Sequence, residues 1–283
     1  MGRWAALVAV IWCALSSAAS AKPAMWVVRD ADSEIYLFGT VHMLGEGAAW
    51  RTPLFDDVYE RADTVWVETA VDKAQAKALM RHYGADPERR LSEKLSPRLM
   101  RRLAPLLANR RIPVASADSL RPWAAAMILS VQSAGAGRAS LENGPDLVIA
   151  RAATEAAKPL RTFETMEDQF RMLAGLPEEA EVAYLKSVVD DHIHPPAGSL
   201  EDAWAEGDLS GLARQMVDDM RRNNPGLYEA LLKRRNESWA RTLTVEMRGN
   251  GVQLVNVGAL HMVGKHGLPA LMRARGFSVE RVQ

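Results

Sequence analysis

Two fragments far apart in the chain share one pattern, LFGTVHMLG over 37–45 and NVGALHMVG over 256–264. In each, an apolar run typical of a strand ends in Gly-x-x-His-Met-x-Gly, so His42 and His261 hold equivalent places. In a parallel α/β sheet, ligands bind where strands end, and glycine permits the tight turn there. The repeat therefore predicts two neighbouring strands that direct two histidines into one space. A lone histidine at a strand end is more often structural, but two copies with matching flanks favour a shared function.

The rest of the chain alternates strand-like runs with helical patterns. Short runs rich in β-branched and aromatic residues predict strands at 25–30, 34–39, 64–68, 159–164, 252–258 and 277–283, with a hairpin turn at 31–33. Apolar residues that recur every three or four positions predict helices at 97–109, 121–133, 145–157, 178–192, 208–222, 225–248 and from 266 or 267 to 276. We therefore expect an α/β fold, a mixed and largely parallel central sheet built from two related β-Gly-x-x-His units, with an inserted helical cap. The segment 135–144, GAGRASLENG, is expected to be a mobile loop.

The first 21 residues have the layout of a secretory signal peptide, with an arginine, an apolar run over 4–15 and then small residues. We expect cleavage before Lys22, which would leave one domain over 22–283 in the periplasm or outside the cell. The alternative is an N-terminal membrane anchor, which the short apolar run disfavours because a spanning helix needs about 20 apolar residues. Contact with a membrane is therefore expected only if the signal stays uncleaved.

Charge and cysteine content restrict the chemistry. The 283-residue chain has 35 Lys and Arg against 35 Asp and Glu, and it has no dense basic run, which argues against a nucleic-acid partner. Cys13 is the one cysteine and lies inside the expected signal. The mature protein would therefore have no cysteine, which excludes thiol catalysis, thiolate zinc sites and Fe–S clusters. Its length is sufficient for a core that is stable without disulfides. The sequence does not indicate the oligomeric state.

Two imidazoles alone make a poor metal site, so a carboxylate is needed. Glu68 ends the strand-like run TVWVE, where an exposed acid is the ordinary alternative. Glu164 ends PLRTFE in the same way, although it could instead cap the helix that follows. Two histidines and one carboxylate match the ligand set of hydrolytic zinc sites. The same three ligands also bind other divalent ions on one face of their coordination shell. Such sites activate water for attack on a carbonyl, so hydrolysis is the expected chemistry.

Arg235 lies in the apolar stripe of a predicted helix. The stripe steps by four along the helix, through Leu227, Leu231, Trp239 and Leu243. A guanidinium in such a stripe needs a carboxylate partner, either from the protein or from a substrate. We expect Arg235 to orient Glu68 or Glu164. The alternative is a surface arginine whose stem covers apolar neighbours.

Other motifs carry less weight. The segment DDHIHPP over 190–196 has two histidines and two acids, but its prolines place it in a loop, and a metal site there is not favoured. The fragment GALHMVGKH lacks the glycine spacing and the Ser or Thr of a phosphate loop, which argues against nucleotide binding. Neither Gly-x-Ser-x-Gly nor His-Glu-x-x-His occurs, so the signatures of serine hydrolases and zincins are missing.

Taken in order, the motifs make the chain resemble the TraB/GumN family, which is related to the Tiki metalloproteases. The resemblance spans almost the whole mature chain, through YLFGTVH, WVE, RPW (121–123), GPD (144–146), FET, RNESWA and the segment 258–282. It implies an α/β fold with two Gly-x-x-His units and, for the Tiki branch, peptide cleavage dependent on a divalent ion such as Mn, Co or Zn. The family's histidines fall on His42 and His261 and its acid on Glu68. Glu164, Arg235 and Asn236 match motifs whose roles are less defined.

The sequence favours an exported, metal-dependent hydrolase that acts on peptides or other small substrates. His42, Glu68 and His261 would hold the ion, Glu164 would be a base or further ligand, and Arg235 would hold a carboxylate or stabilise an oxyanion. Two alternatives stay open. One is a metal-free, esterase-like hydrolase with His42 as general base, oriented by Glu68 or Glu164. The other is a protein that binds a peptide, glycan precursor, metal or haem without turnover.

Overall fold

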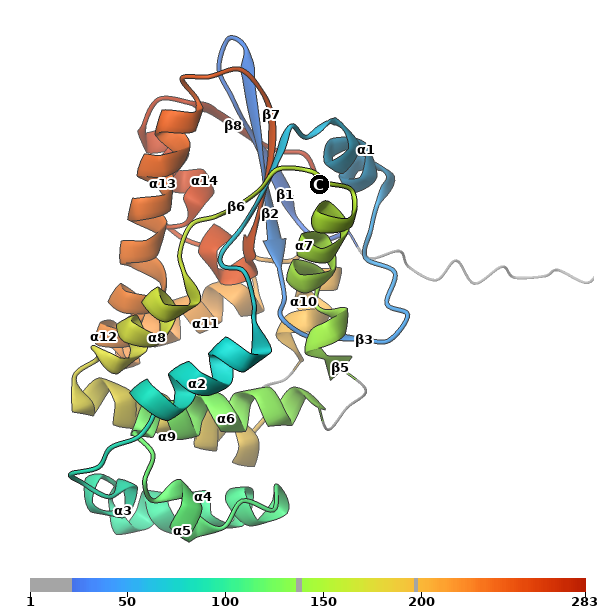
Figure 1. Ribbon diagram of the computed structural model, residues 1–283. Coiled ribbons are helices and arrows are strands. Elements are labelled where there is room, and N and C mark those ends of the chain that lie inside the picture. The colour runs from blue at the N-terminus through green and yellow to red at the C-terminus, as the bar shows by residue number, and fades with distance from the viewer. Residues whose placement is uncertain (1–21, 136–138, 196–197) are drawn as a thin grey trace, which may run out of the picture.

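A central sheet is flanked by helices, and a further group of helices lies beyond one end of its strands (Figure 1). The structure is a computed structural model that describes residues 22–135, 139–195 and 198–283. The expected signal peptide, part of the expected loop at 135–144 and Pro196 of DDHIHPP lie outside the described residues. Within the described ranges, no helix combines the length and apolar character that crossing a membrane requires.

The sheet has six strands in the order β6-β4-β7-β2-β1-β8. Their bounds are Leu160–Thr162 (β6), Thr64–Val67 (β4), Gly251–Gly258 (β7), Ser33–Thr40 (β2), Met25–Arg29 (β1) and Ser278–Arg281 (β8). Neighbours β6, β4, β7 and β2 run parallel, whereas β1 is antiparallel to both β2 and β8. The α/β class and the mixed, largely parallel sheet are therefore confirmed. A second sheet of β3 (Leu44–Gly45) and β5 (Ala139–Ser140) was not predicted.

The two strands that carry the repeated fragments are hydrogen-bonded neighbours. Strands β2 and β7 pair in parallel, with Thr40 opposite Gly258. A Cβ atom at Gly39 would lie 3.1 Å from the Cα atom of Ala259, so the first motif needs glycine there for the backbone after β7 to pass. The close approach of the two chain segments thus accounts for one of the repeated glycines.

Helices cover both faces of the sheet (Figure 1). One face has α1 (Pro53–Arg61) and α7 (Pro145–Glu155), and the other has α13 (Arg234–Glu246) and α14 (Leu268–Ala274). Under α13, the rings of Trp66, Phe163 and Trp239 stack in sequence, with centroids 4.7 and 5.0 Å apart. This aromatic stack joins the sheet to the helix that carries Arg235.

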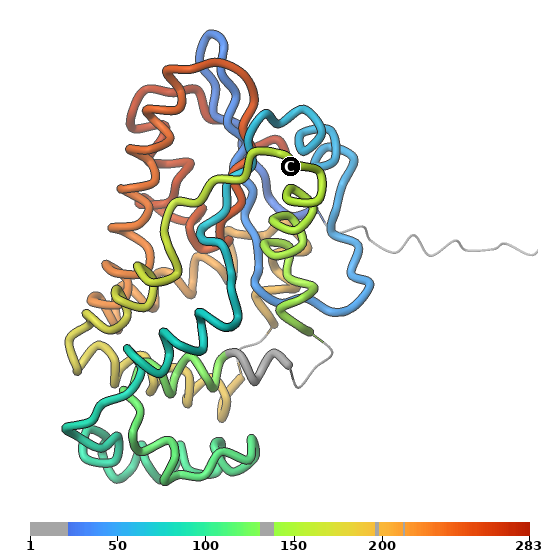
Figure 2. Tube along the Cα trace, viewed as in Figure 1, coloured from blue at the N-terminus to red at the C-terminus, as the bar shows by residue number. Residues whose placement is uncertain are grey.

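The remaining helices lie largely beyond the carboxyl ends of the parallel strands. In Figure 2 the cyan and green part of the chain, residues 73–130, leaves the sheet after β4 and runs through this region. The helices are α2 (Lys73–Tyr83), α3 (Leu91–Lys94), α4 (Pro97–Asn109), α5 (Val114–Ala117), α6 (Pro122–Gly135), α8 (Met166–Ala174), α9 (Glu178–Ile193), α10 (Leu200–Ala205), α11 (Leu212–Asn223) and α12 (Pro225–Tyr228). Two apolar clusters separate from the main core hold most of these helices together, whereas α10 and α11 pack into the main core.

Helices α1, α2, α3, α5 and α10 were not predicted from the sequence, and two of the predicted helices differ in extent or continuity. The helix predicted at 208–222 begins at Leu212, because the Asp208 carboxylate accepts hydrogen bonds from the N–H groups of Ser210 and Gly211 and forms a turn. The helix predicted at 225–248 is interrupted by a π-helical segment, η2 (Glu229–Lys233), between α12 and α13. Apolar periodicity alone does not reveal a π-helical insertion, which often lies near a functional site.

Candidate active site

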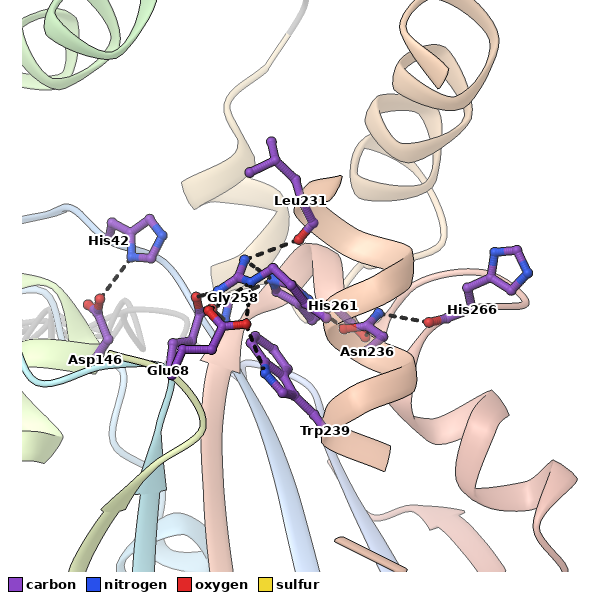
Figure 3. Close-up of polar contacts among 11 residues, drawn as sticks. His42, Glu68, Asp146, Leu231, Asn236, Trp239, Gly258, His261 and His266 are labelled. Atoms are coloured by element: carbon purple, nitrogen blue, oxygen red, sulfur yellow. Dashed lines mark hydrogen bonds and ion pairs between the residues drawn. The ribbon is translucent and has the colours of Figure 1, made fainter. Parts of the chain in front are cut away.

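Four adjacent parallel strands each lead into a predicted site residue. Strand β2 leads to His42, β7 to His261 in the 3₁₀ helix η3 (Ala259–Met262), β4 to Glu68 and β6 to Glu164. The site therefore lies at the carboxyl ends of the strands, the edge at which open α/β sheets bind ligands. Figure 3 shows that α13 brings further side chains against this edge.

Arg235 connects both predicted acids. Its Nη2 donates to Glu68 Oε2 at 2.6 Å, and its Nε donates to the two oxygens of Glu164 at 2.9 and 3.0 Å. Its Nη1 donates to the carbonyl of Leu231, within the π-helical segment, at 3.1 Å. The side chain is only 10% exposed, so the surface-arginine alternative is wrong. Arg235 has two carboxylate partners, where the sequence predicted one or the other.

Glu68 is fixed on both of its oxygens. Its Oε1 accepts a hydrogen bond from the N–H of Gly258 at 2.7 Å, while Oε2 faces Arg235. A Cβ atom at position 258 would lie 3.2 Å from Oε1, so the glycine of the second repeat leaves room for this carboxylate. Burial by itself raises the pKa of Glu68, but the Arg235 charge and the Gly258 hydrogen bond hold the pKa well below its usual range. Glu68 is therefore ionised at neutral pH.

His261 is buried, neutral and oriented by an amide. Asn236 Nδ2 donates to the carbonyls of His261 and His266, at 3.3 and 2.7 Å, which directs its Oδ1 to His261 Nδ1 at 2.5 Å. Nδ1 therefore carries the proton and Nε2 keeps its lone pair. Burial lowers the pKa of His261 to about 3. Its Nε2 lies 3.7 Å from Glu68 Oε1 and 3.2 Å from Arg235 Nη1.

His42 has a different partner. Its Nδ1 lies 2.8 Å from Asp146 Oδ2, in the first turn of α7. This hydrogen bond to the Asp146 carboxylate raises the pKa of His42 to about 9. A Cβ atom at Gly144 would overlap the carbonyl oxygen of His42, so the glycine of GPD lets α7 begin close enough for this contact. Asp146 ends GPD, a motif of the family resemblance, but the sequence predicted no role for this residue.

The predicted site residues thus fall into two groups. Glu68, Glu164, Arg235 and His261 form one network, whereas His42 pairs with Asp146 (Figure 3). Across the described residues, no hydrogen bond or ion pair joins His42 to the network. Glu164 also accepts from Trp239 Nε1 at 3.1 Å, so both of its oxygens are engaged. Its alternative role as a helix cap falls instead to Thr165.

One cavity of about 290 Å³ connects the two groups. His42, Glu68, Arg235 and Asp146 line its polar end. His42 presents a side chain that is 63% exposed, so solvent reaches its ring from the cavity. Three oxygens of lining residues are buried and without a hydrogen-bond partner in the described structure, namely Asp146 Oδ1, Thr40 Oγ1 and Thr69 Oγ1. Buried polar atoms are normally hydrogen-bonded, so these oxygens indicate a place for water, an ion or a ligand.

Two donors of the network, Glu68 of the cavity lining and the buried His261 outside that lining, have a spacing that fits a divalent ion. Ligands of a zinc ion lie about 2 Å from it, so two of them stand roughly 3 to 4 Å apart, as His261 Nε2 and Glu68 Oε1 do. Arg235 Nη1 competes for the same lone pair of His261. In the described ranges, no three His, Cys, Asp or Glu side chains are grouped as a metal site. Binding by His42, Glu68 and His261 together therefore requires His42 and Arg235 to shift.

The TraB/PrgY/gumN family matches the chain over residues 24–281, so this protein belongs to that family. Uncharacterized protein YbaP of Escherichia coli (strain K12) is 25% identical over 267 residues, which cover 94% of this chain and 98% of YbaP. Uncharacterized protein YbaP of Shigella flexneri is similar to the same extent. No solved structure matches the chain.

Proposed function

We propose that this protein is an exported hydrolase that cleaves peptides or related acyl compounds with a divalent ion held by His42, Glu68 and His261. The observation that supports it best is the Arg235 network, because it keeps Glu68 ionised beside the lone pair of His261. A bound divalent ion would polarise a carbonyl and make bound water a nucleophile near neutral pH. Export would follow from cleavage of the N-terminal signal before Lys22.

Each residue of the site has a separate role in the proposed reaction. Glu68 and His261 offer one charged and one neutral ligand, and Asn236 keeps the lone pair of His261 directed at the site. Glu164, engaged on both oxygens, holds Arg235 in place, and the positive charge of Arg235 would stabilise a developing oxyanion beside Glu68. Asp146 orients His42, which can act as a ligand or transfer a proton from Nε2. We further propose that the two Gly-x-x-His segments are related units, closed over by a cap formed by the helices beyond the strand ends.

A metal-free hydrolase is the second proposal, favoured by one contact. The 2.8 Å approach of His42 Nδ1 to Asp146 is the arrangement that orients a histidine general base, which would act as pH rises towards its pKa of about 9 and the ring loses its proton. The orienting acid would then be Asp146, rather than the Glu68 or Glu164 that the sequence indicated.

The decisive measurement is the divalent-metal content of the mature protein, residues 22–283, purified without chelating resin. We expect stoichiometric Mn, Co or Zn, lost in both His42→Ala and His261→Ala but retained in His82→Ala, whose histidine is exposed on α2. Turnover of a peptide mixture should stop on chelation and return on reloading. A wild type that takes up no ion while its turnover depends on His42 would favour the metal-free enzyme. Tight binding of a ligand without any turnover would overturn both proposals.

A further inference from the structure

The cavity beside the proposed reaction centre has an apolar wall. Helix α8 contributes Phe170, Met172 and Leu173, helix α7 contributes Leu147, α6 contributes Met127, and the π-helical segment contributes Leu231. The charged groups follow strands β2 and β4 or lie at the starts of α7 and α13, and Gln169 adds one neutral polar side chain on α8. A substrate in this space would therefore have its reacting bond at one end and an apolar group at the other.

The mouth of the cavity is apolar too. Val71 and Leu141 line the cavity, and 52% and 38% of their surfaces, respectively, are exposed. They are two of only six large hydrophobic residues that are exposed among the described residues. Exposed apolar groups gathered at a concave site mark a place for an apolar ligand rather than a solvated surface.

The charges around the cavity disfavour an anionic ligand. Arg235 is paired with two carboxylates, and His42 faces Asp146. Near the mouth, Lys73 pairs with Glu142, which also binds Arg151. No cation that lines the described cavity is left free for a carboxylate or phosphate. The cavity must therefore select its ligand through apolar contacts and through neutral polar atoms.

The size of the cavity limits the occupant. At about 290 Å³ it lies at the lower end of the range of roughly 300 to 1,000 Å³ found for ligand pockets. This space accommodates one large side chain and the adjoining amide, and it is too small for a haem. The Oγ1 atoms of Thr40 and Thr69 lie buried in the wall without a hydrogen-bond partner in the described structure. Methionine in the wall adapts to side chains of different shape.

We propose that this cavity is a specificity pocket for one large, uncharged apolar side chain, such as Leu, Met or Phe, on the residue next to the cleaved bond. The inference rests on the proposed hydrolase for the bond that is cleaved, but the pocket itself can be tested without turnover. Ala150, on α7, lines the cavity, and Phe at this position fills it from the side. Leu147→Ala enlarges it instead, without adding atoms to a packed structure. Thr154→Phe is the matched control, because Thr154 is exposed on the same helix and lies outside the cavity.

The test measures binding of N-acetyl amino-acid amides to the mature protein by isothermal titration calorimetry, with thermal unfolding as the check on folding. The leucine and phenylalanine amides should bind at least about tenfold more tightly than the alanine and glutamate amides, since each missing methylene costs roughly tenfold or more in a fitted pocket. Ala150→Phe should abolish this preference, Leu147→Ala should move it towards phenylalanine, and Thr154→Phe should preserve it. Equal affinity for all four amides, or a preference that survives Ala150→Phe, would overturn the proposal.

Hydrolysis of a peptide mixture separates this inference from the proposed function. Cleavage sites enriched at least about tenfold in large apolar residues support both. Cleavage without such enrichment would overturn the pocket while leaving the hydrolase. Selective binding of the apolar amides, with no cleavage under any metal, supports the pocket and contradicts the hydrolase.

Discussion

The N–H of Gly258 donates to Glu68 Oε1 at 2.7 Å, which ties the acid after β4 to the backbone at the end of β7. The same carboxylate accepts a hydrogen bond from Arg235, which also donates to Glu164, the acid that follows β6. Three strand ends are thus connected through one buried guanidinium. The network therefore holds the ends of the parallel strands together and is also a candidate reaction centre. Experiments can separate the two roles.

Replacement of Arg235 should destabilise the fold. Arg235→Met leaves the largely buried carboxylates of Glu68 and Glu164 without their cation, and breaking such a pair costs about 3 kcal/mol. The free energy of unfolding in urea at pH 7 measures this loss. Arg234→Met, at the neighbouring residue whose side chain is 74% exposed, should change stability by less than about 0.5 kcal/mol. Equal stability of the two variants would contradict the stabilising role of Arg235 at the strand ends.

The Asp146→Asn variant should lower the pKa of His42. The wild-type pKa is raised to about 9 by the hydrogen bond with Asp146, and the amide keeps an acceptor but removes the charge. Because the folded pKa lies above the unfolded value of 6.5, this pair stabilises the protein fully below pH 6.5 and loses its effect as pH rises through 9. NMR titration of the chelated protein measures the shift, with the exposed His82 as internal reference. A His42 resonance that titrates identically in both proteins would exclude the ion pair.

Asn236 should control the lone pair of His261. In Asn236→Leu, the Nδ1–H of His261 loses its acceptor and two carbonyls lose their donor, at a cost of about 2 to 3 kcal/mol. Metal affinity should also fall by roughly 10- to 100-fold, as for other partners of metal-binding histidines. Urea unfolding and competition with a chromogenic chelator give the two values. Asn223→Leu, an exposed position on α11, is the control and should leave both unchanged.

The sequence pattern was sufficient to predict the strands of the central sheet. It was not sufficient to predict which side chains contact the two histidines. Strands β2, β4 and β7 are short apolar runs followed by glycine or an acid, which the sequence alone reveals, whereas β6 (Leu-Arg-Thr) is mostly polar and exposed. The contact between His42 and Asp146 joins residues 104 apart in sequence, and it depends on how the loop at Gly144 passes His42. The π-helical segment before Arg235 has the same apolar spacing as an α-helix, so only the folded backbone distinguishes it.

The outlying helices have an acid-sensitive contact of their own. The hydrogen bond from Lys94 holds the pKa of Asp86 at about 2, below its ordinary value of 3.8. A depressed pKa stabilises the folded state above pH 3.8, and the effect disappears as pH falls through 2. Asp86→Asn should therefore cost about 1 kcal/mol at pH 7, after allowance for solvent screening, and nothing near pH 2. Parallel urea titrations at the two pH values test this, and a cost that persists in acid would assign the effect to packing.

The repeated motif offers an internal comparison between its glycines. At Gly258 a Cβ atom would lie 3.2 Å from Glu68 Oε1, whereas at Gly45 it would meet nothing within 4 Å. Gly258→Ala should push the carboxylate away from its N–H donor and reduce activity or metal affinity at least about tenfold, with little effect on stability because a side chain can yield. Gly39→Ala meets backbone instead and should lower the free energy of unfolding by about 1 to 3 kcal/mol. Gly45→Ala should change neither quantity. If Gly258→Ala binds metal and turns over as the wild type does, the Gly258–Glu68 contact has no part in the function. Gly258 then serves only the turn after β7.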